Sequence, residues 1–218
     1  MSNSQKDIFL AGEADAWLER NLEALKKLAE KPGDPVFLAA EEIFQNHNFA
    51  NKPRVLEVGC GNGQRLAALS QAFQADCYGL EPSSKAVELA QAQGVNAQIG
   101  TADQLPYPDN HFDILIFGFC LYLCDREDLF KIAQEANRVL KPNAWLLIYD
   151  FYAEAHTNRP YHHCEGVNSY KMDYRKLFDW HPAYTCYSHK VFGHGEHKLC
   201  DDPQEWIAIS TLRKASPV

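Results

Sequence analysis

Long hydrophobic runs and clusters of basic residues are absent from this sequence. The longest apolar stretch, residues 114–123, is too short to span a bilayer, and the polar residues 1–7 lack the apolar core of a signal peptide. The sequence contains no cluster of five or more lysines and arginines, and its formal charge is -8. Both features disfavour nucleic acid and anionic membrane surfaces as partners. We therefore expect a soluble, cytoplasmic protein.

Cysteine pairs with redox or zinc-ligand spacing are also absent. The seven cysteines are scattered, their number is odd, and none forms a C-x-x-C pair. In a cytosolic chain we expect reduced thiols, several of them packed in the core. Histidine and cysteine occur together at residues 162–164 and 194–200, but neither segment has a recognised zinc spacing. We therefore predict no metal site.

The length and composition favour one folded domain with additions. The chain has 218 residues, of which 46% are apolar, and it shows no repeat or low-complexity segment. Residues 12–30 and 36–45 show helical spacing and are separated by a Pro-Gly-Asp-Pro break. Both precede the first predicted strand, so we expect residues 1–50 to form an N-terminal helical cap on a core of residues 51–218.

Short apolar runs alternate with amphipathic segments between residues 54 and 150. The runs predict strands, and the intervening segments 64–72, 84–93 and 126–140 predict helices. The predicted strands are residues 54–58, 77–81, 96–99, 112–118 and 145–150. Strands separated by helices pair in parallel with helices on both faces. This pattern predicts an α/β fold with a three-layer, doubly wound sheet.

The pattern changes after residue 150. Residues 151–169 are polar, aromatic and rich in histidine, and residues 170–180 are predicted to be helical. Residues 184–192 and 205–214 alternate as strands do, and the loop that joins them is short enough for antiparallel pairing.

Residues 55–63 are the most informative segment. Strand-forming residues that include Glu57 run into Gly59, Gly61 and Gly63. Glycine lets the backbone turn tightly and lie against a ligand, and ligands bind at strand ends in open α/β sheets. A dinucleotide loop, G-x-G-x-x-G, places its third glycine three residues after the second, whereas Gly63 follows Gly61 by two. The spacing therefore disfavours a nicotinamide oxidoreductase.

This G-x-G-x-G loop resembles motif I of the class I S-adenosylmethionine-dependent methyltransferases. The resemblance covers residues 54–150 in order, with family-like strands to about residue 214. It implies a seven-stranded sheet, mostly parallel, in which a hairpin places an antiparallel last strand between the fifth and sixth. It also implies S-adenosylmethionine as cofactor, S-adenosylhomocysteine as product, and an acceptor-side insertion at about residues 151–180.

The resemblance assigns the donor site by position. Glu81 ends the second predicted strand about 20 residues after the loop, where a βαβ unit places a carboxylate on ribose hydroxyls; a solvated acid at a helix start is the alternative. Asp103 resembles the acid that accepts the adenine amino group, or it caps a short helix. Phe119 stands where family members line the methyl-donor pocket. The predicted cofactor-binding residues of the core are Glu57, Gly59, Cys60, Gly61, Gly63, Glu81, Pro82, Ala102, Asp103, Gln104 and Phe119.

The first predicted helix carries two further candidates, Trp17 and Arg20. Similar stretches occur in leading helices of small-molecule methyltransferases, where they can close over the donor. Arg20 could pair bidentately with the donor's carboxylate. An ordinary core-facing tryptophan and a surface ion pair of Arg20 with Glu23 are the alternatives.

Candidates for catalysis follow the fifth predicted strand. Asp150 and Tyr152 sit at its carboxyl end, which faces the site by topology, and His162 and His163 follow on the loop. Methyl transfer from a sulfonium is an in-line displacement that depends largely on alignment. A neutral amine needs no dedicated base, whereas a hydroxyl benefits from one, and histidine suits that role.

Our leading hypothesis is methyl transfer to O or N of a small-molecule metabolite. An RNA or protein methyltransferase would need a basic channel beside the glycine loop. A non-catalytic methyltransferase-like binding protein would be expected to have a damaged loop or to lack the ribose acid, and both are intact here. Whether the chain is a monomer or a homodimer stays open.

Overall fold

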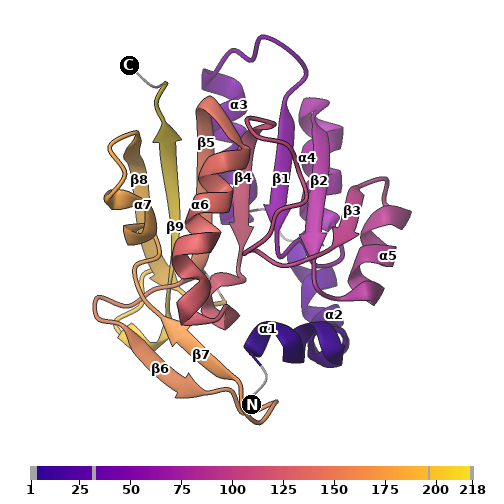
Figure 1. Cartoon of the computed structure of the whole chain (residues 1–218), viewed down its shortest axis with the longest axis vertical. Coiled ribbons are helices and arrows are strands. Elements are labelled where there is room, and N and C mark those ends of the chain that lie inside the picture. Colours follow the sequence, from indigo (N-terminus) through magenta and orange to yellow (C-terminus); the bar gives the residue numbers. More distant parts are fainter. Residues whose placement is uncertain (1–3, 31–32, 196, 217–218) are drawn as a thin grey trace.

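The computed structural model describes residues 4–30, 33–195 and 197–216, and a seven-stranded sheet forms its centre (Figure 1). The strands are, in spatial order, β3 (Asn96–Ile99), β2 (Asp76–Glu81), β1 (Arg54–Val58), β4 (Phe112–Gly118), β5 (Leu140–Phe151), β9 (Trp206–Lys214) and β8 (Tyr184–Gly193). The first five pair in parallel, and β9 pairs antiparallel with both β5 and β8. The predicted fold class is confirmed, including the antiparallel last strand between the fifth and sixth.

Helices cover both faces of the sheet because the central strands are apolar on both sides. In β4, Ile114 and Ile116 pack against α3 (Pro35–Asn46), α4 (Gln64–Phe73) and α5 (Ser84–Ala92) on one face. Leu115 and Phe117 face the opposite core with α6 (Leu129–Val139) and α7 (Lys176–Asp179). All four side chains are fully buried, which is expected for a strand with both faces covered.

The predicted break before α3 is also its start signal. Asp34 accepts a hydrogen bond from the Val36 N–H at 2.9 Å, and Pro35 occupies the first helical turn. Such a cap satisfies an otherwise unpaired donor, and proline costs nothing at this position. Ser83 caps α5 in the same way, through the Ala86 N–H at 3.0 Å.

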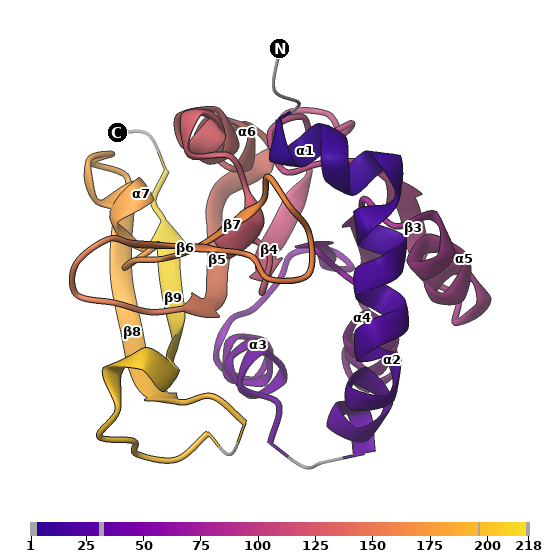
Figure 2. The same ribbon diagram turned by 90° about the horizontal axis from the view of Figure 1, so that it is seen from below.

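The N-terminal segment lies across the carboxyl ends of the parallel strands. It consists of α1 (Gln5–Ile8), a π-helical turn (Phe9–Glu13) and α2 (Ala14–Glu30). Asp15 fixes α2 to the start of α5 by accepting a hydrogen bond from the Ser83 hydroxyl at 2.6 Å. Seen from below, α1 and α2 lie on one side and the segment after β8 on the other, with the hairpin of β6 (Thr157–Pro160) and β7 (Asn168–Lys171) between them (Figure 2).

The helix predicted at residues 170–180 is wrong over most of its length. Asn158 of β6 pairs with Tyr170 of β7, and only α7 is helical. The Arg126 guanidinium lies over the Tyr170 ring, 4.2 Å from its centroid, and donates to the Tyr174 hydroxyl at 3.2 Å. These contacts come from a distant part of the chain, so tertiary packing overrides the local pattern.

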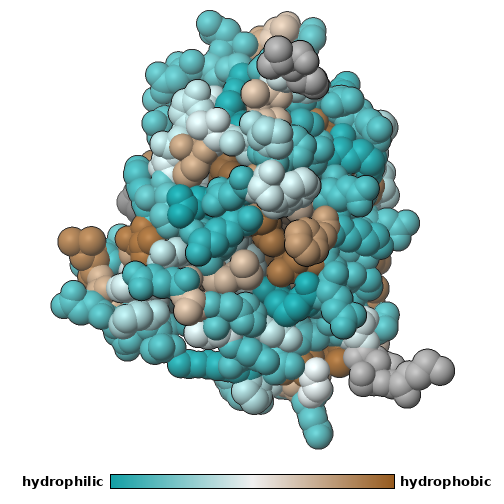
Figure 3. Space-filling model, turned by 60° about the vertical axis from the view of Figure 1, so that its left-hand side comes forward, coloured by the Kyte–Doolittle hydropathy of each residue, from teal (hydrophilic) through white to brown (hydrophobic). Residues whose placement is uncertain are grey.

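The face of the molecule on the β8 side shows no large apolar patch among the described residues. Viewed with the β8 side brought forward, it is mostly hydrophilic with separate hydrophobic groups (Figure 3). Among the residues that the structure describes, no helix combines the length and apolar character that a membrane crossing requires.

Candidate functional site

A cavity of about 1310 Å³ lies at the carboxyl ends of β1, β2, β4 and β5. Its walls come from the glycine loop, the starts of α3 and α4, the N-terminal segment, the turn after β6 and the loop after β8. Parallel α/β sheets bind ligands at this edge, where the strand order reverses between β1 and β4. The site therefore lies where the sequence predicts it.

The glycine loop needs its three glycines for different reasons. All three have positive φ, at 76° for Gly59, 52° for Gly61 and 76° for Gly63. A Cβ on Gly59 would lie 2.7 Å from the Cβ of Cys120, and one on Gly63 would lie 2.7 Å from the Cβ of Ala90. At Gly61 the nearest atom would be a Leu25 methyl at 3.9 Å. Gly59 and Gly63 thus serve close packing, whereas Gly61 leaves bare main chain toward the cavity.

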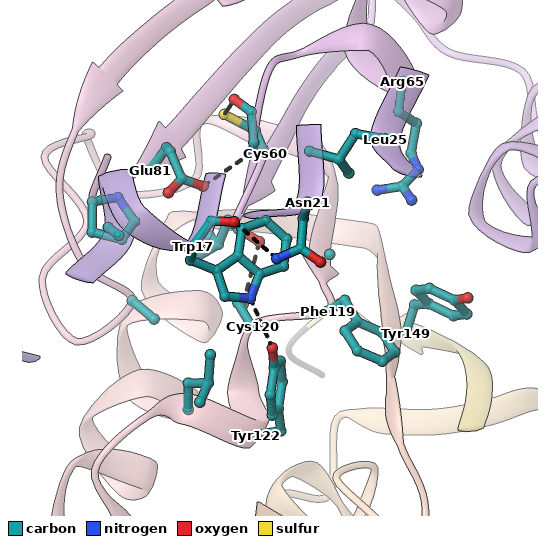
Figure 4. A pocket seen from close by; sticks show the side chains of 18 of the residues that line it. Trp17, Asn21, Leu25, Cys60, Arg65, Glu81, Phe119, Cys120, Tyr122 and Tyr149 are labelled. Atoms are coloured by element: carbon teal, nitrogen blue, oxygen red, sulfur yellow. Dashed lines mark hydrogen bonds between the residues drawn. The ribbon is translucent and has the colours of Figure 1, made fainter. Parts of the chain in front are cut away.

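Glu81 holds the loop from the neighbouring strand. Its two carboxylate oxygens accept the Gly61 N–H at 3.0 Å and the Ser83 N–H at 3.1 Å. Figure 4 shows the Glu81 side chain in the cavity wall. Burial raises the pKa of Glu81 to about 7, although these two hydrogen bonds oppose the shift. Glu81 and Pro82 both line the cavity, as predicted for a residue that meets a ribose.

Glu57 and Arg65, which flank the glycine loop in the sequence, form a buried ion-pair cluster with Asp34. Glu57 is fully buried and pairs with Arg65, whose Nε also donates to Asp34 at 2.6 Å. Burial raises the pKa of Glu57 despite the nearby guanidinium. Arg65 and Asp34 line the cavity, whereas Glu57 does not. Glu57 therefore acts on the site from outside the lining, as the buried partner of Arg65.

Asp103 borders the cavity beside Ala102, and it already has cationic partners. Lys6 donates to its carboxylate at 2.7 Å, Lys131 at 3.1 Å and the Thr101 hydroxyl at 2.7 Å. Burial opposes ionisation, but these hydrogen bonds outweigh it and lower the pKa of Asp103 to about 2. The predicted site residue Gln104 is exposed and does not line the cavity.

The two N-terminal candidates differ in position. Trp17 lines the cavity, and its Nε1 donates to the Tyr122 hydroxyl at 3.3 Å (Figure 4). Arg20 lies outside the lining and pairs with Glu13 and, at 3.2 Å, with the Tyr161 hydroxyl. Arg20 therefore holds α2 to the turn after β6 in this structure.

Phe119 follows β4 in an unusual backbone conformation. Its φ is 63°, and its N–H donates to the Tyr149 carbonyl at 2.8 Å. Its ring lines the cavity, in contact with the rings of Tyr122, Tyr149 and Phe151. A bulky residue with positive φ is a steric outlier, and such outliers concentrate at binding sites.

The four catalytic candidates separate into two pairs. His162 and His163 line the cavity at the turn after β6, with ring centroids 3.9 Å apart. Asp150 and Tyr152 do not line it, which corrects the expectation that they face the site. Side chains alternate along β5, so Asp150 points to the face opposite Tyr149 and Phe151.

Asp150 has a clear structural task instead. One carboxylate oxygen accepts the N–H groups of Leu121 at 2.8 Å and Tyr122 at 3.3 Å, which fixes the turn after Phe119. Burial raises the pKa of Asp150 to about 7, while these backbone hydrogen bonds oppose the shift.

Sequence reasoning missed the far wall of the cavity. Tyr149 and Phe151 come from β5, Tyr161 from the turn after β6, and His194 and His197 from the loop after β8. The alternation of Tyr149, Asp150 and Phe151 was a signal that the two rings share a face. No comparable signal exists for the loop, because its position depends on the pairing of β8 with β9.

Comparison with known proteins agrees with this geometry. Residues 56–148 match the family described as methyltransferase domain. The uncharacterized methyltransferase YcgJ of Bacillus subtilis is 36% identical over 108 residues, which cover 46% of this chain and 41% of that protein. Norajmaline N-methyltransferase of Rauvolfia serpentina is 32% identical over 156 residues, 64% of this chain and 50% of that protein. The chain thus spans about half the length of the curated relatives it matches.

A solved structure extends the likeness in fold to almost the whole chain. The 1,6-didemethyltoxoflavin-N1-methyltransferase of Burkholderia thailandensis superimposes with a TM-score of 0.67 and 14% identity, over 97% of this chain and 87% of its own. That structure contains S-adenosylhomocysteine and 1,6-didemethyltoxoflavin. The resemblance to the class I methyltransferases is confirmed by the match of residues 56–148 to the methyltransferase-domain family, and the solved structure agrees with it in fold.

Proposed function

We propose that this chain is an S-adenosylmethionine-dependent methyltransferase that transfers the methyl group to O or N of a small molecule. One observation carries the proposal: a single cavity is lined both by the glycine loop with Glu81 and by side chains at the carboxyl ends of β4 and β5. We call these two parts of the cavity its two compartments. Typical ligand pockets measure about 300–1,000 Å³. At about 1310 Å³, this cavity has room for a donor and an acceptor together.

The donor would occupy the compartment at the ends of β1 and β2. Gly61 exposes main chain there, Glu81 supplies acceptor oxygens for a ribose, and Ala102 and Asp103 border the next position along the sheet edge. When bound, the sulfonium supplies an electrophilic methyl group that an acceptor lone pair takes in line, leaving the C–S electrons on sulfur. The chain's own residues align the acceptor, exclude water, and receive the proton of an O–H or N–H.

His162 and His163 are the proposed proton acceptors, since they alone of the four candidates border the cavity. Their turn is tied to the N-terminal segment. Arg20 reaches Tyr161, and the Gln5 side chain donates to the Asn168 carbonyl at 3.2 Å and accepts the Asn168 N–H at 2.6 Å. We therefore treat residues 1–50 as a cap and residues 151–180 as the acceptor-side insertion of one site.

Calorimetric titration with S-adenosylmethionine and S-adenosylhomocysteine tests the donor site. We expect both to bind the wild-type chain and Gly61→Val to lose at least 100-fold in affinity, because valine would place side-chain atoms where main chain now borders the cavity. Gly94→Val is the matched control: Gly94 also has a positive φ of 82° and open space around its missing Cβ, but it does not line the cavity. Both variants place a β-branched residue at a positive φ, and only Gly61 borders the cavity.

Two results would defeat the proposal. The first is a folded wild-type chain that binds neither compound at millimolar concentration. The second is a folded Gly61→Val protein with wild-type affinity. Stabilisation by NAD rather than by S-adenosylhomocysteine in a thermal-shift assay would favour an oxidoreductase instead.

A further inference from the structure

The compartment under β4 and β5 is walled by aromatic rings from three separate elements. We call Phe119, Tyr122, Tyr149, Phe151 and His194 the aromatic wall, and all five line the cavity. The Phe119 ring lies at its centre. Its centroid is 4.8 Å from that of Phe151, 5.3 Å from those of Tyr122 and Tyr149, and 5.8 Å from that of His194.

The backbone accepts strain to hold this ring in place. Phe119 has a φ of 63°, a conformation better suited to glycine, and Asp150 and the Tyr149 carbonyl fix the main chain on either side of it. Strain of this kind persists only where the surroundings enforce it. Side chains at the end of β4 could pack in the core without it, as Phe117 does.

The two hydroxyl groups of the aromatic wall, on Tyr149 and Tyr122, have hydrogen-bond partners in the protein. The Tyr149 hydroxyl and His197 Nε2 lie 3.1 Å apart in a hydrogen bond, and the Tyr122 hydroxyl accepts from Trp17. Burial raises the pKa of both tyrosines, so they stay neutral phenols. The wall therefore offers a ligand chiefly ring surface.

The lining also argues against an anionic acceptor. Its lysine and arginine side chains, among the residues that the structure describes, are Lys6 and Arg65. Lys6 pairs with Asp103 and Asp128, and Arg65 pairs with Glu57 and Asp34. A phosphate or carboxylate bound by either of these cations would have to displace a carboxylate, whereas a neutral ring would not.

We propose that the aromatic wall binds a neutral, planar aromatic acceptor whose ring carries the hydroxyl or amine that is methylated. The inference rests on the proposed function and adds the substrate class. Aromatic rings favour offset or edge-on partners with centroids about 4.5–7 Å apart, a geometry that a planar ring can complete and a saturated ring cannot.

The test compares planar compounds with their ring-saturated counterparts. The probes are 2-naphthol against decahydro-2-naphthol and phenol against cyclohexanol, all uncharged at pH 7, with dissociation constants measured by ligand-observed NMR in the presence and absence of S-adenosylhomocysteine. We expect at least one planar member to bind at least tenfold more tightly than its counterpart. Phe119→Leu and Phe151→Leu should each weaken its binding at least fivefold, while Phe130→Leu, at a position that is 75% exposed outside the cavity, should leave it unchanged.

Three outcomes overturn the inference: equal binding within both pairs, no binding of either planar probe, or planar binding that neither Phe119→Leu nor Phe151→Leu weakens. Two positions are tested so that one poorly folded variant does not decide the result. Failure of the proposed function looks different, because S-adenosylhomocysteine then fails to bind while the preference for planar probes persists.

Discussion

At the ends of β1 and β2 the cavity is bounded by main chain, and at the ends of β4 and β5 it is bounded by rings. The first part is held by backbone hydrogen bonds to Glu81 and by Gly59 and Gly63, which have no room for a Cβ. The second is held by contacts among side chains that are remote in sequence. We infer that the first compartment is suited to a ligand common to a family and the second to a ligand that varies within it.

Loss of the Arg65 side chain should have the largest effect. It tests whether the first compartment depends on main chain alone, because Arg65 lines the cavity and pairs with Glu57 and Asp34. Arg65→Met would leave Glu57, which is fully buried, without its cation. We expect a loss of about 3–5 kcal/mol in the free energy of unfolding, measured by urea denaturation at pH 7.

The double variant Arg65→Met with Glu57→Gln serves as the control, and it should recover part of that loss, because Glu57 no longer places an unpaired charge in the core while Asp34 still lacks its cation. The loss should also shrink as the pH is lowered, since burial raises the pKa of Glu57 and protonation removes the unpaired charge. A single variant as stable as the wild type at pH 7 would mean that Glu57 is already neutral in the folded chain.

Gly59→Ala should be the next most damaging change. The new methyl group would lie 2.7 Å from the Cβ of Cys120, in addition to the strain of a positive φ. We expect a loss of about 2–4 kcal/mol in the free energy of unfolding. Gly94→Ala, with a similar φ and open space, should lose only about 1 kcal/mol. Equal losses would show that the loop can move away from Cys120.

The buried carboxyl groups of Glu81 and Asp150 should each lower the free energy of unfolding as pH rises. The pKa of Asp150 is raised from 3.8 and that of Glu81 from 4.5, both to about 7. Between about pH 4 and pH 7 the folded chain therefore binds more protons than the unfolded chain, so each group contributes a negative slope of at most about 1.4 kcal/mol per pH unit.

Urea denaturation across this range measures the slope, and Asp150→Asn and Glu81→Gln should each flatten it. Asp103 does not obscure the effect. Its pKa is lowered to about 2, so its stabilising contribution is already complete above about pH 4. A slope that neither Asp150→Asn nor Glu81→Gln changes would contradict both assignments.

The sequence predicted the main-chain compartment well because its requirements are local. Gly59, Gly61 and Gly63 each need a positive φ, and that need is visible as glycine in the sequence. The strands were equally visible as apolar runs, since both faces of the sheet are covered.

The side-chain compartment was predicted only in part, because its residues meet through tertiary structure. The position of Asp150 at the end of a strand predicts that it faces the site, although alternation with Tyr149 indicates the opposite face. Local spacing predicts a helix at residues 170–180, because Arg126, whose guanidinium stacks on Tyr170, lies far away in the sequence. His194 reaches the cavity only once β8 pairs with β9.

Phe119→Gly should give the smallest change in stability. It also tests most directly whether the two compartments bind their ligands independently. Glycine relieves the strain of a φ of 63°, which contributes about 1 kcal/mol in its favour, while loss of a half-buried ring costs about 1–2 kcal/mol. The free energy of unfolding should therefore change by about 1 kcal/mol or less.

Affinity for S-adenosylhomocysteine should stay within threefold of the wild type, because the glycine loop and Glu81 are untouched. Binding of the planar probes should fall at least tenfold. A variant that loses both affinities together would show that the compartments are one unit, and the distinction between a main-chain site and a side-chain site would then no longer hold.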